Sequence, residues 1–319
     1  MRLIRDREWQ PLLALTERPN VIQRQLLSSI LFSQRDTQFG RRHAFASIRS
    51  YEEFVRAVPV LGYEDLRHDI EGQEQNGEFH LNAERPVHYV QTSGTTGKPK
   101  HVPLIRSAID WISQYQRLFA YAQWSGVSGI YEGQVLVIAG QTVEGYLPGG
   151  SPYGSMSGLM NEGLPQAIRQ KSVLPDGILR VADIRVKYLR MAACAVAAGT
   201  LSVLATPNPS TILKLLEVIR SEFSHLVEAL TVGPRHPIFS QGTAWTEPVP
   251  IHVDRLAYLR TLMGQASKLD LATLWPDLRA VITWTGGNCS VLISKLRSLS
   301  SKEMAVIEMG YLSSECLGS

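Results

Sequence analysis

Apolar residues in this chain recur at helical spacing in some segments and form short continuous runs in others. Residues 107–124 have apolar positions every three or four residues and predict an amphipathic helix. Helices that alternate with apolar strands indicate a mixed or parallel sheet covered by helices on both faces. The pattern therefore predicts an α/β fold. The continuous runs that predict strands are residues 87–90, 134–139, 201–205, 278–284 and 304–309.

The first 85 residues lack such runs and predict a mainly helical region. Asn20 is a candidate cap for a helix whose apolar positions begin at Val21. Ser50, followed three residues later by Glu53, has the spacing of a capping box and predicts the start of another helix.

Three segments in the middle of the chain complete the predicted elements. The apolar run that begins at Met191 predicts a buried helix that ends at Gly199. Asn208 predicts the start of a helix that extends to about Arg220. Residues 140–163 are rich in glycine and show neither the helical nor the strand period, so they predict an irregular segment. A segment of that length inside a compact domain is usually functional or mobile.

Composition narrows the class of protein. The 319 residues are 44% hydrophobic and can bury a large core. A net charge of +3, spread through the chain, gives no electrostatic footprint for nucleic acid. The longest apolar run falls short of the ~20 residues that a membrane helix needs. Three cysteines do not make a disulfide framework in a chain of this length. We expect a cytoplasmic protein with neither nucleic acid nor a membrane as its partner.

The most informative segment is Thr92–Lys100, which reads Thr-Ser-Gly-Thr-Thr-Gly-Lys-Pro-Lys. Its glycines allow tight turns and close approach to a ligand. Its hydroxyl groups and successive backbone N–H groups can form a concave anion site, and its two lysines add charges that suit phosphate. The segment therefore predicts a loop that holds a polyphosphate.

This loop differs from the common P-loop, which has four residues between its first glycine and its Gly-Lys pair. Here two threonines alone separate the glycines, and Pro99 follows Lys98. Proline prevents a helix from continuing directly out of the loop. We therefore expect the phosphates under a glycine- and threonine-rich flap rather than on a helix N-terminus. The alternative is an ordinary polar turn.

Two later segments follow predicted strands, at the end where α/β sheets bind ligands. Gly286 and Gly287 offer bare backbone to a flat base, and Asn288 can bond the edge of that base. The alternative there is a plain turn from strand to helix. Residues 311–315 follow the last predicted strand, and their Ser-Ser-Glu, read by itself, is a helix cap.

Together these motifs resemble those of the GH3 family of acyl-acid amido synthetases, which belong to the adenylate-forming enzymes. The resemblance is scattered over nearly the whole chain, and the phosphate loop and the Ser-Ser-Glu segment are its most specific parts. The matching segments are residues 39–45, 50–54, 58–60, 63–67, 92–103, 274–278, 283–287 and 311–315.

The resemblance implies the large N-terminal domain of an adenylate-forming enzyme, with mixed β-sheets flanked by helices and a helical N-terminal region. Residues 1–85 would be that helical region, packed on the main domain. Residues 86–319 would be the α/β ATP-binding (adenylation) region. Family members continue with a third nucleotide motif and a smaller C-terminal domain, so we expect the chain to be truncated before them and limited in activity alone.

The implied reaction uses ATP and Mg²⁺ to activate a carboxylic acid as an acyl-adenylate. Lys98, Thr95, Ser314 and Glu315 are the implied catalytic residues, with Glu315 as the Mg²⁺ ligand, and Tyr311 would stack on the adenine. The residues implied to bind the nucleotide are Thr92, Ser93, Gly94, Thr95, Thr96, Gly97, Lys98, Lys100, Gly286, Gly287, Asn288, Tyr311, Ser313 and Ser314.

The family then joins the acyl group to an amino acid or another amine, so a carboxylic acid and such an acceptor are the expected partners. Two alternatives stay open. One is a CoA ligase of the same superfamily, similar to the phenylacetate–CoA ligases. The other is a truncated, inactive domain that binds a nucleotide or a protein. The sequence does not identify the acid, the acceptor or the oligomeric state.

Overall fold

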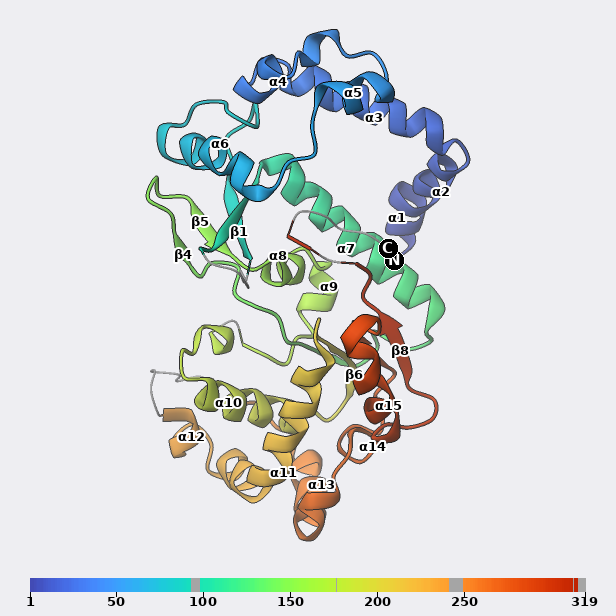
Figure 1. The fold of residues 1–319 in the computed structure, drawn as a ribbon. Helices are drawn as coiled ribbons and strands as arrows, with labels where there is room; N and C mark the ends of the chain where they lie inside the picture. The colour runs from blue at the N-terminus through green and yellow to red at the C-terminus, as the bar shows by residue number, and fades with distance from the viewer. Residues whose placement is uncertain (93–97, 176, 241–248, 312, 315–319) are drawn as a thin grey trace. The chain divides into compact units, whose positions relative to one another are not determined.

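The computed structural model describes residues 1–92, 98–175, 177–240, 249–311 and 313–314 (Figure 1). These residues form two compact units, each with its own four-stranded sheet. The first unit comprises Met1–Tyr121 and Gln141–Gly163, with Ser313 and Ser314. The second comprises Ala122–Gly140 and the described residues from Leu164 to Tyr311. The division into a helical region of residues 1–85 and an ATP-binding region of residues 86–319 stays a prediction.

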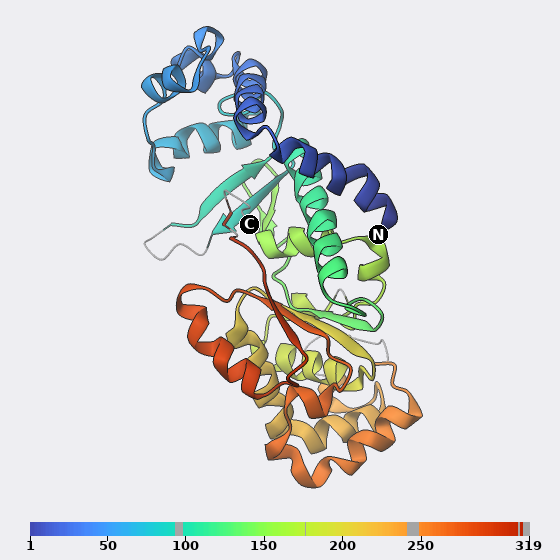
Figure 2. The ribbon, with the colours of Figure 1, turned by 90° about the vertical axis from the view of Figure 1, so that its right-hand side faces the viewer.

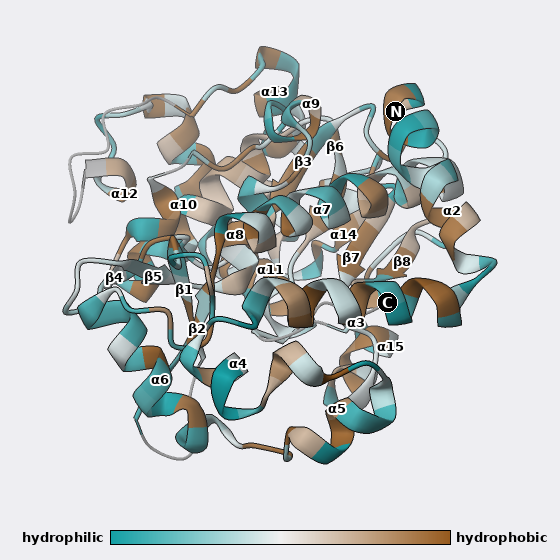
Figure 3. Ribbon diagram, turned by 90° about the horizontal axis from the view of Figure 1, so that it is seen from above, coloured by the Kyte–Doolittle hydropathy of each residue, from teal (hydrophilic) through white to brown (hydrophobic). Residues whose placement is uncertain are grey.

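The sheet of the second unit is parallel throughout, in the order β3-β6-β7-β8 (Figure 2). Each strand lies within a predicted apolar run, which confirms those predictions. The central strands β6 and β7 are buried along their whole length, and the strands of this sheet are coloured as hydrophobic in Figure 3. The strands are β3 (Gln134–Val137), β6 (Leu201–Ala205), β7 (Ala280–Thr283) and β8 (Ala305–Glu308).

Helix α10 (Ile184–Ala197) enters the core of the second unit and confirms the predicted buried helix. Every residue from Arg190 to its end is buried. The last carbonyl groups of a helix have no partner within the helix, so a buried helix end needs other donors. Trp275 Nε1 donates to the Ala195 oxygen and Arg255 Nε to the Val196 oxygen, both at 2.9 Å. These side chains cap the helix in the interior.

Helix α11 (Pro209–Val232) begins as predicted, because the Asn208 side chain accepts a hydrogen bond from the Ser210 N–H at 2.9 Å. The predicted end near Arg220 is wrong. Buried apolar residues continue at helical spacing through Leu230, and the helix ends at Val232, directly before Gly233, whose φ is 78°. The other helices of this unit are α9 (Gln166–Arg169), α12 (Pro237–Ser240), α13 (Val253–Thr261), α14 (Leu271–Leu274) and α15 (Ser290–Ser298).

The sheet of the first unit is mixed, in the order β2-β1-β5-β4. Strand β1 pairs antiparallel with β2 and parallel with β5, and β5 pairs antiparallel with β4. Strand β1 confirms the strand predicted before the phosphate loop. The strands are β1 (His88–Thr92), β2 (Lys100–Leu104), β4 (Gly145–Tyr146) and β5 (Pro152–Gly154).

The prediction of an irregular segment over residues 140–163 is wrong in part, because the segment contains β4, β5 and helix α8 (Met156–Glu162). Strands of two or three residues are too short to show a period. The glycines serve close packing, since a Cβ at Gly154 or Gly158 would collide with the backbone of Gln141 and Thr142.

Residues 2–76 of the first unit are mainly helical, as predicted. Asn20 is not the cap of its helix, because Pro19 occupies the first helical position, where proline is favoured. Ser50 is the predicted cap of α5 and accepts a hydrogen bond from the Glu53 N–H at 3.2 Å. In a capping box the Glu53 carboxylate would accept from the Ser50 N–H, whereas here it accepts from the Arg49 N–H at 2.7 Å.

The N-terminal helices run from α1 to α6, and α7 confirms the predicted amphipathic helix. None of the helices in the described ranges combines the length and the apolar character that a membrane span requires. Their bounds are α1 (Arg2–Ile4), a π turn (Arg5–Trp9), α2 (Gln10–Thr16), α3 (Pro19–Gln34), α4 (Gln38–Arg42), α5 (Tyr51–Ala57), α6 (Tyr63–Asn76) and α7 (Arg106–Gly126).

Candidate nucleotide-binding site

The predicted phosphate loop connects two antiparallel strands. Thr92 ends β1, Lys100 begins β2, and the two residues are partners across the strand pair. A strand therefore follows the loop directly, and no helix N-terminus stands at its end. The flap itself stays a prediction. Ser93, Gly94, Thr95, Thr96 and Gly97 lie outside the described residues.

The two lysines of the loop are Lys98, which is exposed, and Lys100, which is half-buried. Within the described part of the chain neither forms an ion pair. The Lys100 ammonium lies 5.7 Å from the centroid of the Tyr63 ring, on the first turn of α6. Lys98 and Lys100 thus place two cations at the start of β2.

In the second unit, Gly286, Gly287 and Asn288 follow β7 and lead into α15. All three are exposed, and a Cβ at either glycine would meet nothing within 4 Å. Gly287 has a φ of 56°, which favours glycine, whereas Gly286 has an ordinary φ of −88°. The segment is a turn from strand to helix, as the alternative predicted. It also leaves open space above bare backbone.

Glu308, the last residue of β8, ties this turn to the segment that follows the neighbouring strand. Its Oε2 accepts hydrogen bonds from the Thr285 N–H at 2.7 Å and from the Thr285 hydroxyl. Its Oε1 accepts from the Gly310 N–H at 3.2 Å. Because β7 and β8 are parallel neighbours, the glycine turn and Tyr311 lie at the same edge of the sheet.

Glu308 was not among the predicted site residues, because it falls within the apolar run 304–309 that predicts a strand. The available signal was a carboxylate at the end of such a run, directly before a Met-Gly pair. Burial acts to raise the pKa of Glu308, but the hydrogen bonds from Thr285 and Gly310 outweigh it and hold the pKa below its ordinary value. The carboxylate is therefore ionised near neutral pH.

Comparison with known proteins gives the chain its family. A model of the GH3 family N-terminal domain matches residues 9–304. The chain belongs to the GH3 family. Indole-3-acetic acid-amido synthetase GH3.15 of Arabidopsis thaliana is 23% identical over 318 residues, which cover 95% of this chain and 52% of that protein. Indole-3-acetic acid-amido synthetase GH3.5 of the same plant is 28% identical over 140 residues, 43% of this chain and 23% of the relative.

Solved structures of GH3.15 share the fold. One, described as an acyl acid amido synthetase in complex with 2,4-DB, superposes with a TM-score of 0.79 and 21% identity, over 93% of this chain and 53% of that one. A second has a TM-score of 0.75 and also 21% identity, over 96% and 55%. The predicted fold class, an α/β fold with sheets flanked by helices as in GH3 proteins, is confirmed. The chain spans about half the length of the relatives that it matches along most of its own length.

The residues that resemble GH3 motifs are divided between the two units. Thr92, Lys98, Lys100 and the half-buried Ser313 and Ser314 belong to the first unit. The glycine turn with Asn288, and Tyr311, which is 67% exposed, belong to the second. Glu315, the predicted Mg²⁺ ligand, lies outside the described residues. The binding roles of all these residues stay predictions.

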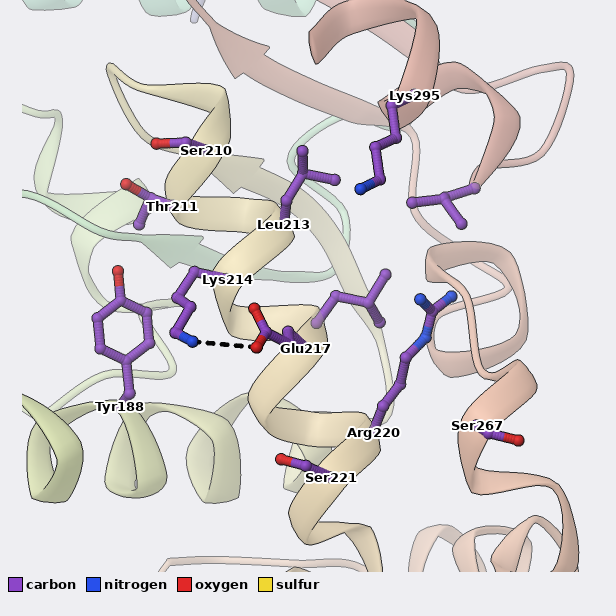
Figure 4. Close-up of a pocket in the computed structure, with 12 residues that line it drawn as sticks. Tyr188, Ser210, Thr211, Leu213, Lys214, Glu217, Arg220, Ser221, Ser267 and Lys295 are labelled. Atoms are coloured by element: carbon purple, nitrogen blue, oxygen red, sulfur yellow. Dashed lines mark hydrogen bonds and ion pairs between the residues drawn. The ribbon is translucent and has the colours of Figure 1, made fainter.

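A groove of about 870 Å³ runs along α11 in the second unit, and none of the predicted residues lines it (Figure 4). Lys214 pairs with Glu217 at 3.2 Å, and Arg220 Nε donates to the Leu269 oxygen at 2.6 Å. Two of its three basic side chains are thus engaged within the protein. The groove is best described as a solvated face of α11 and adjoining helices.

Proposed function

We propose that this chain forms the ATP-binding part of a GH3 acyl acid amido synthetase, which activates a carboxylic acid as an acyl-adenylate. The observation that carries the proposal is the hairpin in which paired residues Thr92 and Lys100 flank the glycine- and threonine-rich loop. It supports the proposal because the strand pair brings the two ends of the loop together and keeps Lys98 and Lys100 beside them. Membership of the GH3 family supports the same activity.

In the proposed reaction a carboxylate oxygen of the acid attacks the α-phosphorus of ATP. The bond from that phosphorus to the bridging oxygen breaks, and pyrophosphate leaves with the bonding electron pair. Because charge grows on phosphate oxygens, catalysis depends on positioning and on electrostatic stabilisation. Lys98 and Lys100 would hold the leaving phosphates, together with the hydroxyl and N–H groups of the loop.

The turn after β7 is proposed to receive the adenine base. Open space above Gly286 and Gly287 supports this role, because a flat base can approach backbone that carries no side chain. Tyr311, exposed at the same edge of the sheet, would stack on the base. The Asn288 side chain would bond the base edge, since an amide offers both a donor and an acceptor.

Mg²⁺ is proposed to bind Glu315. Within the described residues no group of three or more His, Cys, Asp or Glu side chains could hold a metal ion. Mg²⁺ usually takes only one or two carboxylates and completes its shell with substrate phosphates and water, so a single glutamate beside the nucleotide fits the ion. When bound, the ion would neutralise charge on the leaving phosphates.

The second half-reaction is proposed to be amide formation, with an amino acid or another amine as the acceptor. The relatives are named as amido synthetases of indole-3-acetic acid, and one solved relative holds 2,4-DB. These names favour an amine acceptor over coenzyme A, and they make aryl-substituted aliphatic acids the first substrates to test.

The test is calorimetric titration of the purified chain with ATP and Mg²⁺, for wild type and for Lys98→Ala. Loss of one charge-assisted contact to phosphate weakens binding by about 1.5–3 kcal/mol, or roughly ten- to a hundredfold. Lys302→Ala is the matched control, because Lys302 is also exposed and lies in a turn before β8.

Pyrophosphate release with a panel of carboxylic acids, including indole-3-acetic acid and 2,4-DB, then measures the chemical step. A folded wild-type chain that binds no ATP would contradict the proposal. So would binding that Lys98→Ala and Lys302→Ala leave equally strong. Tight ATP binding without pyrophosphate release for any acid would support the inactive nucleotide-binding alternative.

A further inference from the structure

Strand β2, which forms one side of the phosphate hairpin, is an edge strand of its sheet. An edge strand presents backbone groups that no neighbouring strand satisfies. In β2 the Tyr63 hydroxyl meets this need at His101. It accepts a hydrogen bond from the His101 N–H at 2.7 Å and lies 3.2 Å from the His101 carbonyl oxygen, to which it can donate.

The next outward residue is Pro103, which has no N–H and therefore needs no acceptor at this edge. His101 and Pro103 are two residues apart in the strand, so both direct their backbone groups away from β1. The Tyr63 phenol therefore accepts from the one outward N–H that residues 100–104 present. His101 lies one residue beyond Lys100 and three beyond Lys98.

Two cations lie near the Tyr63 ring. The Arg67 guanidinium lies 4.8 Å from the ring centroid, and the Lys100 ammonium lies 5.7 Å from it. Both distances are within the range of cation–π attraction. Arg67 is fixed in turn by two hydrogen bonds to Glu64, of 2.7 and 2.8 Å. Burial raises the pKa of Tyr63, so its hydroxyl keeps its proton.

We infer that Tyr63 is a positioning residue for the phosphate hairpin: its hydroxyl fixes the backbone of His101, and its ring orients Lys100. The inference rests on the proposed function, because it assumes that the hairpin holds the phosphates of ATP. Tyr63 touches no phosphate in this scheme. Its effect on affinity comes from holding β2 and Lys100 in place before the ligand arrives.

Two substitutions separate the two parts of this role. Tyr63→Phe keeps the ring but removes both hydrogen bonds to His101, and we expect it to weaken ATP and pyrophosphate binding about fivefold to tenfold. Tyr63→Leu also removes the cation–π partner of Lys100, so we expect a further loss of about threefold. Adenosine should bind all forms equally, because it has no phosphate.

The experiment combines calorimetry with hydrogen exchange of the segment 98–104, for wild type, Tyr63→Phe and Tyr63→Leu. Tyr51→Phe is the matched control, since Tyr51 is 62% exposed on α5. The expected result is faster exchange in this segment and weaker ATP and pyrophosphate binding for the two Tyr63 variants alone. A purely structural role would lower the melting temperature and leave the ratio of ATP to adenosine affinity unchanged.

Three results would overturn the inference. Unchanged exchange in Tyr63→Phe would mean that the phenol does not hold β2. Unchanged ATP affinity in a Tyr63→Phe protein, with wild-type binding intact, would overturn the positioning role and leave the proposed function standing. Absence of ATP binding by folded wild type would overturn both. The failure of the proposed function is thereby distinguishable from the failure of the inference.

Discussion

Glu308 offers a direct test of the sheet edge in the second unit, because donors from two segments converge on its carboxylate. Glutamine has nearly the same shape, but an NH₂ group replaces one of the two oxygens. Glu308→Gln therefore loses the hydrogen bonds that this oxygen accepts, either from Thr285 or from Gly310. A hydrogen bond to a charged group contributes about 1.5–3 kcal/mol, and solvent exposure reduces that contribution. We expect Glu308→Gln to lower the free energy of unfolding by about 1–2 kcal/mol near neutral pH.

The pH dependence gives the sign of this effect. The pKa of Glu308 in the folded protein lies below its ordinary value, and a glutamate in the unfolded chain titrates at about 4.3. The stability that the carboxylate contributes is therefore fully present above about pH 5 and is lost as the pH falls through the folded pKa. The difference between wild type and Glu308→Gln should shrink in the same range.

The assay is urea unfolding followed by circular dichroism, repeated from neutral pH to about pH 3. Glu303→Gln is the control, because Glu303 is exposed near the opposite end of β8 and should change stability by no more than about 0.5 kcal/mol. Equal stability of the two variants at neutral pH would refute the reasoning. A difference that persists undiminished in acid would refute the role assigned to the charge.

Two further predictions concern stability and use the same unfolding assay. Trp275→Phe should lower the free energy of unfolding by about 2–4 kcal/mol, because it leaves the buried Ala195 oxygen without its donor and opens a cavity. Trp111→Phe is the control, at a position 65% exposed, and should cost less than about 0.5 kcal/mol. Equal losses would contradict the prediction. Asp69→Asn should lower the free energy of unfolding by about 2–3 kcal/mol, because Arg42 binds the buried carboxylate at 3.0 and 3.1 Å. This cost should fall in acid, since these bonds outweigh burial and lower the pKa of Asp69. A cost that does not change with pH would refute the reasoning.

Much of the fold could be predicted because its strongest signals are local. Strand β6 and helix α10 come from one continuous apolar run, and the break at Gly199 separates them. Strands β4 and β5 could not be predicted, since two or three residues carry no period and their glycines resemble those of loops. The length of α11 was underestimated, although its apolar spacing continues beyond Arg220.

The candidate site divides in the same way. The lysines and glycines of the phosphate loop lie together in the sequence, so their joint chemistry could be read from it. The contact between Tyr63 and His101 joins residues 38 positions apart, and that between Thr285 and Glu308 spans 23. Such pairs depend on the register of a strand and the docking of a helix, neither of which the local pattern specifies.

These two contacts suggest a common principle for the proposed nucleotide site. Glycine-rich segments lose much conformational freedom when a ligand orders them, and this loss opposes binding. Tyr63 and Glu308 form hydrogen bonds with backbone beside two such segments and hold that backbone in place before a ligand arrives. Affinity for ATP should therefore depend on two residues that do not touch it.

The two contacts belong to different compact units and share no hydrogen-bond partner. Independent effects add, so Tyr63→Phe combined with Glu308→Gln should weaken ATP binding by the sum of the two single losses in binding free energy, within about 0.5 kcal/mol. Calorimetry of the two single variants and the double variant measures this directly. A departure well beyond that margin would mean that the two contacts act through a common element, and the view that Tyr63 and Glu308 act separately would fail.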